Sequence, residues 1–326
     1  MKNHPLMFVD NGTGEVMKNS LGYSQVISTL TAVGRVVSKQ KFYEIPPADY
    51  VPIVMGNGAY KRTIINWRTY VKGEGFDAGL ISNASNNAGV NHADAAFDQI
   101  SQNVLNWALG VRYNVFELQE ALMANTLFSL IEARELARRK LWDLGIQKTA
   151  FLGIGAETGV LNNANVTIDS ATIAERLSTM NATEFNTFVG AIYSAYRAEC
   201  NYTAKPTHFI IPEKDYNSLV QWPDATYPLR TKLSLLLEAF QTITSNQGFK
   251  ILPCVYCDKS QFGTYNRYVL LNYDESSVKM DLNIDYTLTQ AGTQNGFTWE
   301  NIAYGSFTGV VAQRPKEMLY FANTAA

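Results

Sequence analysis

Apolar and polar residues alternate most clearly near the C-terminal end of the chain. From residue 278 to residue 289 every even-numbered position is apolar and every odd-numbered position is polar or charged. A period of two is typical of a strand with one buried face. The segment is therefore predicted to be one strand with Asp281 and Asp285 on its wet face. Further strands are predicted at 307–312 and near 318–321.

A long helix is predicted from Val115 to about Leu144, because 30 residues pass without Pro or Gly and Gly145 is placed to cap the end. Such a helix is roughly 45 Å long, enough to form a spine through the whole subunit. The predicted apolar side carries Met123, Leu127, Leu130, Ala137 and Leu141. The predicted polar side carries Glu117, Glu120, Glu135, Arg138 and Arg139.

Residues 61–71 have the pattern of a half-exposed strand, with Ile65, Trp67 and Val71 on one side and Arg62, Asn66 and Arg68 on the other. A loop rich in Asn and Ser follows at 82–89, and an apolar-rich return segment follows at 100–111. Together these segments predict a long two-stranded excursion. A lone two-stranded ribbon is marginally stable in water, so we expect it to pack against a surface outside its own domain.

The middle of the chain has an α/β pattern. Helices are predicted at about 182–199, 213–221 and 230–244, and apolar strand-like runs at 207–212 and 249–253. Residues 1–49 show no sustained period and end in Ile45-Pro46-Pro47, which favours an extended arm. No repeat of fixed period is present.

Composition adds two expectations. Charged residues make up only 17% of the chain, whereas about 25% is usual for soluble domains. Together with 18 Tyr, 16 Phe and 5 Trp, this indicates either extensive contact with other subunits or an aromatic-rich core. The net charge of −2 provides no basic field, so any contact with DNA is expected to be weak and non-specific. Three cysteines are too few for a disulfide framework, and we expect neither a signal peptide nor a membrane span.

Four patterns resemble chemical sites, and each fails a structural requirement. The glycines of 153–159 follow a helix where a nucleotide-binding loop needs a strand, so a glycine-rich turn is predicted. Cys254 and Cys257 have no second pair, and on a strand they would face opposite sides, so buried structural thiols are predicted. Residues 281–285 resemble a calcium loop but lack its later Gly and Glu. The histidines, none of them in a nucleophile motif, are His4, His92 and His208.

Four short runs between residues 115 and 315 carry a family resemblance. They are 115–121 (Val-Phe-Glu-Leu-Gln-Glu-Ala), 150–153 (Ala-Phe-Leu-Gly), 158–162 (Thr-Gly-Val-Leu-Asn) and 309–315 (Gly-Val-Val-Ala-Gln-Arg-Pro). With the order arm, extended loop, long helix, α/β unit and β-rich end, the chain resembles Hong Kong 97-type major capsid proteins of tailed bacteriophages. The resemblance extends from about Pro52 onward, and the order and spacing carry more weight than any single run.

The resemblance implies an α+β, Hong Kong 97-like fold. Its expected parts are an N-terminal arm (1–49), an extended loop (50–113), a spine helix with the start of the peripheral domain (114–168), an α/β axial domain (169–266) and a β-rich return to the peripheral domain (267–326). It also implies hexamers and pentamers that form an icosahedral shell around double-stranded DNA, with the extended loop over a neighbouring subunit. A portal and a separate scaffold protein are the other expected partners, and assembly is expected in the host bacterial cytoplasm.

The resemblance implies no catalytic residue, no cofactor and no metal. The residues predicted to contact a neighbouring subunit are Lys61, Arg62, Arg68, Lys72, Glu74 and Asp77. Two rival functions remain open. An encapsulin-like shell would share the fold but enclose a cargo enzyme, and an α/β hydrolase or transferase would use the middle domain.

Overall fold

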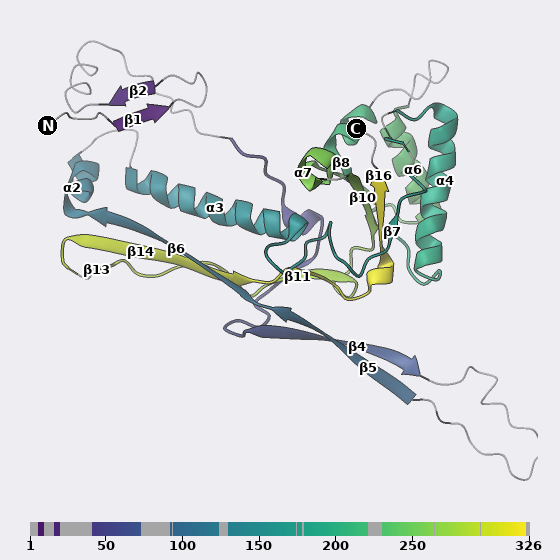
Figure 1. Cartoon of the computed structure of the whole chain (residues 1–326), viewed down its shortest axis with the longest axis horizontal. Helices are drawn as coiled ribbons and strands as arrows, with labels where there is room; N and C mark the ends of the chain where they lie inside the picture. The colour runs from purple at the N-terminus through teal and green to yellow at the C-terminus, as the bar shows by residue number, and fades with distance from the viewer. Residues whose placement is uncertain are drawn as a thin grey trace, which may run out of the picture.

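The computed structural model describes two short strands near the N-terminus and most of the chain beyond residue 40. The described ranges are 6–9, 16–19, 41–72, 92, 94–123, 130–173, 175–177, 179–220, 230–263, 265–293 and 295–323. Figure 1 shows a helix-covered sheet at the right, a long helix along a narrow sheet at the left, and a two-stranded ribbon that projects from the region between them. The two N-terminal strands, β1 (Leu6–Val9) and β2 (Val16–Asn19), pair with each other.

A mixed five-stranded sheet lies at the centre of the helix-covered part, which we call the axial unit. Its strands, in spatial order, are β7 (Ile168–Asp169), β16 (Met318–Asn323), β10 (Asn266–Leu271), β8 (His208–Pro212) and β9 (Lys250–Cys254). The central strand β10 is antiparallel to both neighbours, and the outer pairs are parallel. Its helices are α4 (Ala182–Glu199), α5 (Glu213–Ser218), α6 (Lys232–Thr244) and α7 (Lys259–Phe262).

Both faces of the axial sheet are buried. Phe209 and Ile211 of β8 belong to the core that contains residues of α4 and α6, whereas Ile210 between them belongs to the core shared with the rest of the subunit. A strand buried on both faces needs apolar residues at every position, and for this reason 207–212 forms an apolar run. The predicted helices and strands of this region are confirmed, and α4 begins with a reciprocal capping box between Asn181 and Glu184.

The long helix and the narrow sheet form a second part, which we call the peripheral unit. Its helices are α2 (Val115–Met123) and α3 (Leu130–Leu152), and its strands are β6 (Leu105–Asn114), β12 (Ile284–Leu288), β13 (Gly292–Thr293) and β14 (Thr298–Phe307). Strand β6 pairs with β14 along its whole length. The ring of Trp142 in α3 packs so closely on Gly305 that an added Cβ would lie 2.3 Å from ring carbon Cη2. Gly305 therefore sets the distance between helix and sheet.

The helix prediction needs two corrections. Gly145 does not end the helix but lies inside α3, which continues to Leu152. A single glycine within a helix costs only about 1 kcal/mol, so a long helix can contain one. The predicted apolar side is also wrong where the structure describes it, since Leu141 is 58% exposed while Trp142 and Ile146 are buried. The side chains of Met123, Leu127 and Leu130 lie outside the described residues.

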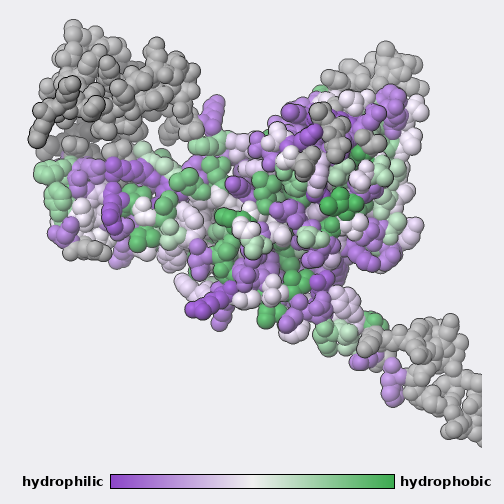
Figure 2. Space-filling view, viewed as in Figure 1, coloured by the Kyte–Doolittle hydropathy of each residue, from purple (hydrophilic) through white to green (hydrophobic). Residues whose placement is uncertain are grey.

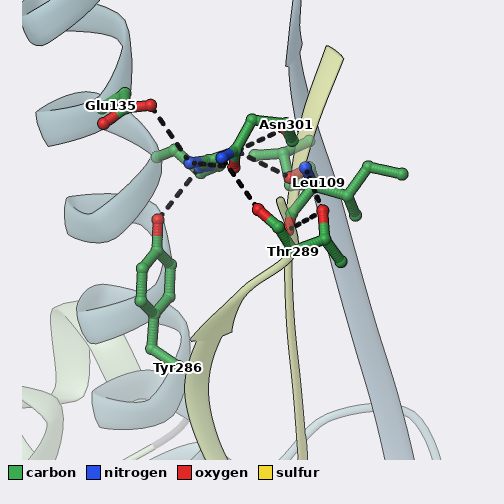
Figure 3. Close-up of polar contacts among 7 residues, drawn as sticks. Leu109, Glu135, Tyr286, Thr289 and Asn301 are labelled. Atoms are coloured by element: carbon green, nitrogen blue, oxygen red, sulfur yellow. Dashed lines mark hydrogen bonds and ion pairs between the residues drawn. The ribbon is translucent and has the colours of Figure 1, made fainter. Parts of the chain in front are cut away.

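The burial of Arg138 explains why the predicted apolar side of α3 is wrong. The sequence predicts this residue on the wet side, yet it is buried against the sheet, where Nη1 donates to the backbone carbonyl of Asn301 (2.7 Å) and Nε donates to the Tyr286 hydroxyl (3.0 Å). Figure 3 shows the polar contacts around Glu135, Tyr286 and Asn301. The Glu135 carboxylate lies 3.8 Å from the Arg138 guanidinium. Five donors on one planar group allow a buried arginine to be satisfied by dipoles, and a hydropathy pattern does not register this.

The alternating segment 278–289 is two strands in two sheets. Strand β11 (Val278–Leu282) lies between β15 (Val310–Ala312) and β3 (Ile53–Met55), whereas β12 pairs with β14. Asp285 is exposed as predicted, but the prediction for Asp281 is wrong, because this carboxylate is fully buried. Its Oδ1 accepts from the amide of Asn57 at 3.0 Å and lies 3.5 Å from the Lys279 ammonium.

The glycine-rich segment 153–159 is a turn at the end of α3, as predicted. Gly153 has a φ of +73°, and a Cβ on Gly159 would lie 2.3 Å from the carbonyl oxygen of Phe151. Asn162 fixes the turn, since its side chain accepts from the Gly159 amide (2.7 Å) and donates to the Leu152 carbonyl (2.7 Å). The remaining short elements are the 3-10 turns η1 (Pro47–Asp49), η3 (Val255–Cys257) and η4 (Pro315–Glu317).

Candidate assembly surfaces

The ribbon consists of two antiparallel strands, β4 (Thr63–Lys72) and β5 (Asp94–Asn103), which pair over ten positions. The predicted two-stranded excursion is thus observed. The apolar return segment is divided, however, because β5 ends at Asn103 and β6 continues from Leu105 into the peripheral sheet. Among the described strands, β4 and β5 pair only with each other.

The two faces of the ribbon differ in character. Residues directly opposite each other share a face, so the odd-numbered positions of both strands form one surface. This surface, which we call the apolar face, carries Ile65 (49% exposed), Trp67 (65%), Val71 (94%) and Phe97 (68%). Figure 2 shows apolar side chains at the surface of the ribbon where it leaves the body. Exposed aromatic and aliphatic groups in one patch are typical of a surface that meets another protein.

The opposite face attaches the ribbon to the body through neutral amides. Asn66 donates to Gln102 across the two strands (3.3 Å), and Gln102 donates in turn to the backbone carbonyl of Gly309 (3.2 Å). Gln313, just after β15, donates to the Asn66 side chain at 3.1 Å. Asn66 and Gln102 are buried although both are polar, because they bond to each other and to the body. These three side chains hold the ribbon at its root.

The six predicted contact residues fall in different settings. Lys61 and Arg62 are exposed just before β4, and Lys72 is the last residue of that strand. Arg68 lies 3.5 Å from Asp98 on the paired strand, so its charge already has a partner within the chain. Glu74 and Asp77 lie outside the described residues. Charge alone points to these six positions and misses the apolar face, although the alternation of that face is visible in the sequence at Ile65, Trp67 and Val71.

The residues considered for chemistry occupy structural positions. His208 stacks on Tyr273 with ring centroids 4.6 Å apart, and burial, followed by the charge of Lys250, lowers its pKa to about 4. The three cysteines are buried free thiols, as predicted for Cys254 and Cys257. The turn η3 nevertheless brings those two side chains together, and burial raises the pKa of the Cys257 thiol.

No metal centre or membrane span is found where the structure can be described. Within those ranges no three His, Cys, Asp or Glu side chains group as metal ligands. None of the helices described combines the length and the hydropathy of a membrane-spanning segment. Of the other histidines, His92 is exposed and His4 lies outside the described residues.

The family of the chain follows from comparison with known proteins. A family model described as major capsid protein matches residues 77–323. The chain belongs to the major capsid protein family. This capsid protein matches no curated protein sequence.

Solved structures of phage capsids share the fold of this capsid protein. The capsid of Myoviridae phage XM1 aligns with a TM-score of 0.74 and 14% identity, over 91% of this chain and 97% of the other. A structure from Mycobacterium phage Ogopogo aligns with a TM-score of 0.55 and 10% identity, over 91% and 98%. The capsid of a native GTA particle aligns with a TM-score of 0.53 and 12% identity, over 94% and 99%. These structures confirm the predicted Hong Kong 97-like fold, and the family model confirms the capsid function.

Proposed function

We propose that copies of this capsid protein join through the ribbon into hexameric and pentameric rings, and that the rings close into an icosahedral shell around double-stranded DNA. In this arrangement the apolar face of the ribbon lies over a neighbouring subunit. The observation that carries the proposal is the exposure of Ile65, Trp67, Val71 and Phe97 on one side of a ribbon that has no further strand partner among the described residues.

The energetics of the apolar face support contact with a neighbour. Burying one large apolar side chain contributes about 1.5–3 kcal/mol, so four of them supply several kcal/mol for each contact. The root amides hold the ribbon in place before the contact forms, which reduces the entropy lost on binding. Lys61 and Arg62 precede β4 and Lys72 is its last residue, and we propose that they meet carboxylates of the neighbour.

The content and setting of the shell are further parts of the proposal. A net charge of −2 favours a shell that encloses DNA but binds it only weakly. A portal and a separate scaffold protein are proposed as additional partners. Assembly in the host bacterial cytoplasm agrees with three free thiols.

Replacement of the apolar rings tests the role of the ribbon. Trp67→Ala combined with Phe97→Ala is expected to leave a folded subunit that forms neither rings nor shells, as seen by size-exclusion chromatography and negative-stain microscopy. Tyr70→Ala is the matched control, because Tyr70 is 47% exposed on the other face of β4. Normal shells from the double variant would contradict the proposal.

The content of the shell needs its own experiment. Particles isolated from the host are expected to protect double-stranded DNA from added nuclease. A protected protein cargo without DNA would favour the encapsulin-like alternative.

A further inference from the structure

The segment 56–62 joins β3 to the first strand of the ribbon, and we call it the root turn. Three of its residues have left-handed backbone, with φ of +76° at Gly56, +73° at Gly58 and +62° at Tyr60. For a bulky residue such as Tyr60 this conformation is strained. Strain of this kind persists only where the surrounding contacts hold the backbone, so the shape of the root turn depends on its contacts with the body.

Two hydrogen bonds attach the root turn to β11. The backbone amide of Gly56 donates to the carbonyl of Leu282 at 3.0 Å. The side-chain amide of Asn57 donates to Oδ1 of Asp281, also at 3.0 Å. Asp281 is fully buried, and its second oxygen, Oδ2, has no hydrogen-bond partner among the described residues. With the Lys279 ammonium 3.5 Å from Oδ1, the buried carboxylate is matched by one cation and one amide donor.

The side chain of Asn57 is also placed for a chemical change. Asn57 is exposed, and the next residue is Gly58. A backbone amide can attack the Cγ atom of the preceding asparagine and close a five-membered imide. Glycine permits this movement because it has no Cβ to obstruct it. Exposure supplies the water that opens the imide, so the root turn holds the nucleophile, the electrophile and the water that the reaction needs.

The reaction balances with water as the sole co-reactant. The Gly58 nitrogen gives its proton to water and bonds to Cγ of Asn57, and the bond from Cγ to the side-chain nitrogen breaks. That nitrogen takes up a proton and leaves as ammonia. Water then opens the imide at either carbonyl, which leaves an aspartate or an isoaspartate. In sum, an amide and a water molecule become a carboxylate and an ammonium ion.

The product at position 57 is incompatible with the contact to Asp281. It replaces an amide donor by a carboxylate, and like charges in contact disfavour each other. Lys279 can neutralise only one of the two carboxylates. Position 57 is exposed, so the new carboxylate can move into water, whereas Asp281 stays buried and loses its amide donor. One of the two attachments of the root turn is then lost.

We propose that Asn57 is a deamidation site and that its conversion releases the root turn from the body of the subunit. The change is irreversible, because the ammonia is lost to solvent. The folded subunit thus carries a one-way chemical switch at the base of the ribbon. The inference concerns the single chain and goes beyond the proposed shell function, so each can fail without the other.

A second Asn-Gly pair, Asn295 and Gly296, provides an internal comparison. Asn295 is exposed, and its Oδ1 accepts hydrogen bonds from the backbone amides of Phe297 and Thr298 in the same turn. A carboxylate oxygen can accept the same bonds. Replacement of Asn295 by aspartate is therefore expected to leave both its own turn and the ribbon unchanged.

Mass spectrometry of the full-length protein tests the chemistry. During incubation at about pH 8 the peptide that contains residue 57 is expected to gain about 1 Da and to become a substrate for an isoaspartate methyltransferase. Asn57→Gln is the control, because glutamine keeps an amide but would have to close a larger ring. An unmodified Asn57 under conditions that convert a free peptide of residues 54–62 would overturn the proposal, as would the same mass gain in the glutamine variant.

Amide hydrogen exchange tests the release of the root turn. Its reporters are the Gly56 amide and the Lys61 amide, which donates to the Gly58 carbonyl at 3.0 Å. In Asn57→Asp, exchange at both is expected to rise at least about tenfold, whereas Asn295→Asp should leave it unchanged. Converted wild-type protein gives the same readout if Asn57→Asp fails to fold. Unaltered exchange after conversion would show that the contact to Asp281 does not hold the root turn, and would overturn the proposal.

Discussion

The guanidinium of Arg138 in α3 donates a 2.7 Å hydrogen bond to the backbone carbonyl of Asn301 in β14, and this contact joins the spine helix to the peripheral sheet. The same side chain bonds to the Asn301 amide oxygen (3.1 Å) and to the Tyr286 hydroxyl of β12. With only 1% of its side chain exposed, the cation is stabilised mainly by dipoles, since Glu135 lies 3.8 Å away.

Arg138→Ala is expected to lower the free energy of unfolding of the unassembled subunit by about 3–5 kcal/mol, because it leaves buried oxygens without a donor. Arg139→Ala is the control. Its partner Asp143 is half exposed on the same helix, and the expected cost is below about 1 kcal/mol. Urea unfolding measures both variants. Equal losses would show that Arg138 does not hold the helix to the sheet.

Two glycines of the spine region are expected to respond to alanine in opposite directions. Gly145 lies within α3 with nothing within 4 Å of an added Cβ, so Gly145→Ala should raise stability by about 0.5–1 kcal/mol. Gly159→Ala places a methyl group 2.3 Å from the Phe151 carbonyl oxygen and should lower stability by about 1–3 kcal/mol or prevent folding. Melting temperatures of the unassembled variants distinguish the two effects. A neutral Gly159→Ala would mean that the turn can open without cost.

Stability is expected to fall as the pH drops from 6.5 toward 4, in part because of His208. Burial lowers its pKa from 6.5 to about 4 in the folded chain, so within this window the unfolded state binds more protons. The contribution of neutral His208 to the free energy of unfolding is complete above pH 6.5. Below pH 6.5 it declines by at most about 1.4 kcal/mol per pH unit. His208→Gln should give a shallower decline between pH 7 and pH 5 in urea unfolding. An unchanged slope would assign the acid sensitivity to other groups.

The basic residues at the ribbon are expected to affect assembly more than folding. Replacing Lys61, Arg62, Arg68 and Lys72 together by Ala should change the melting temperature of the free subunit little, because the partly exposed ion pair Arg68–Asp98 contributes about 0–1 kcal/mol. Repetition over many identical contacts should nevertheless impair shell formation. Light scattering during assembly measures this effect. Wild-type assembly by the fourfold variant would exclude these charges from the contact.

Local patterns in the sequence were sufficient for elements whose surroundings match their hydropathy. The apolar run of β8, helix α4 and the glycine turn after α3 each follow from neighbours in the chain. The order of these elements, together with short motifs, also predicted the capsid fold. These features depend on short-range periodicity and backbone geometry, and both are determined by the residue types at nearby positions in the chain.

Only the tertiary structure decided which polar groups are buried and which apolar groups remain in water. Arg138, Asp281 and Asn66 are buried because residues far away in the chain supply their hydrogen-bond partners. Trp67 and Phe116 stay exposed because no described part of the same chain covers them. A hydropathy pattern records the preference of each side chain for water, but burial depends on partners brought together by long-range packing, and on neighbouring subunits that a single sequence does not contain.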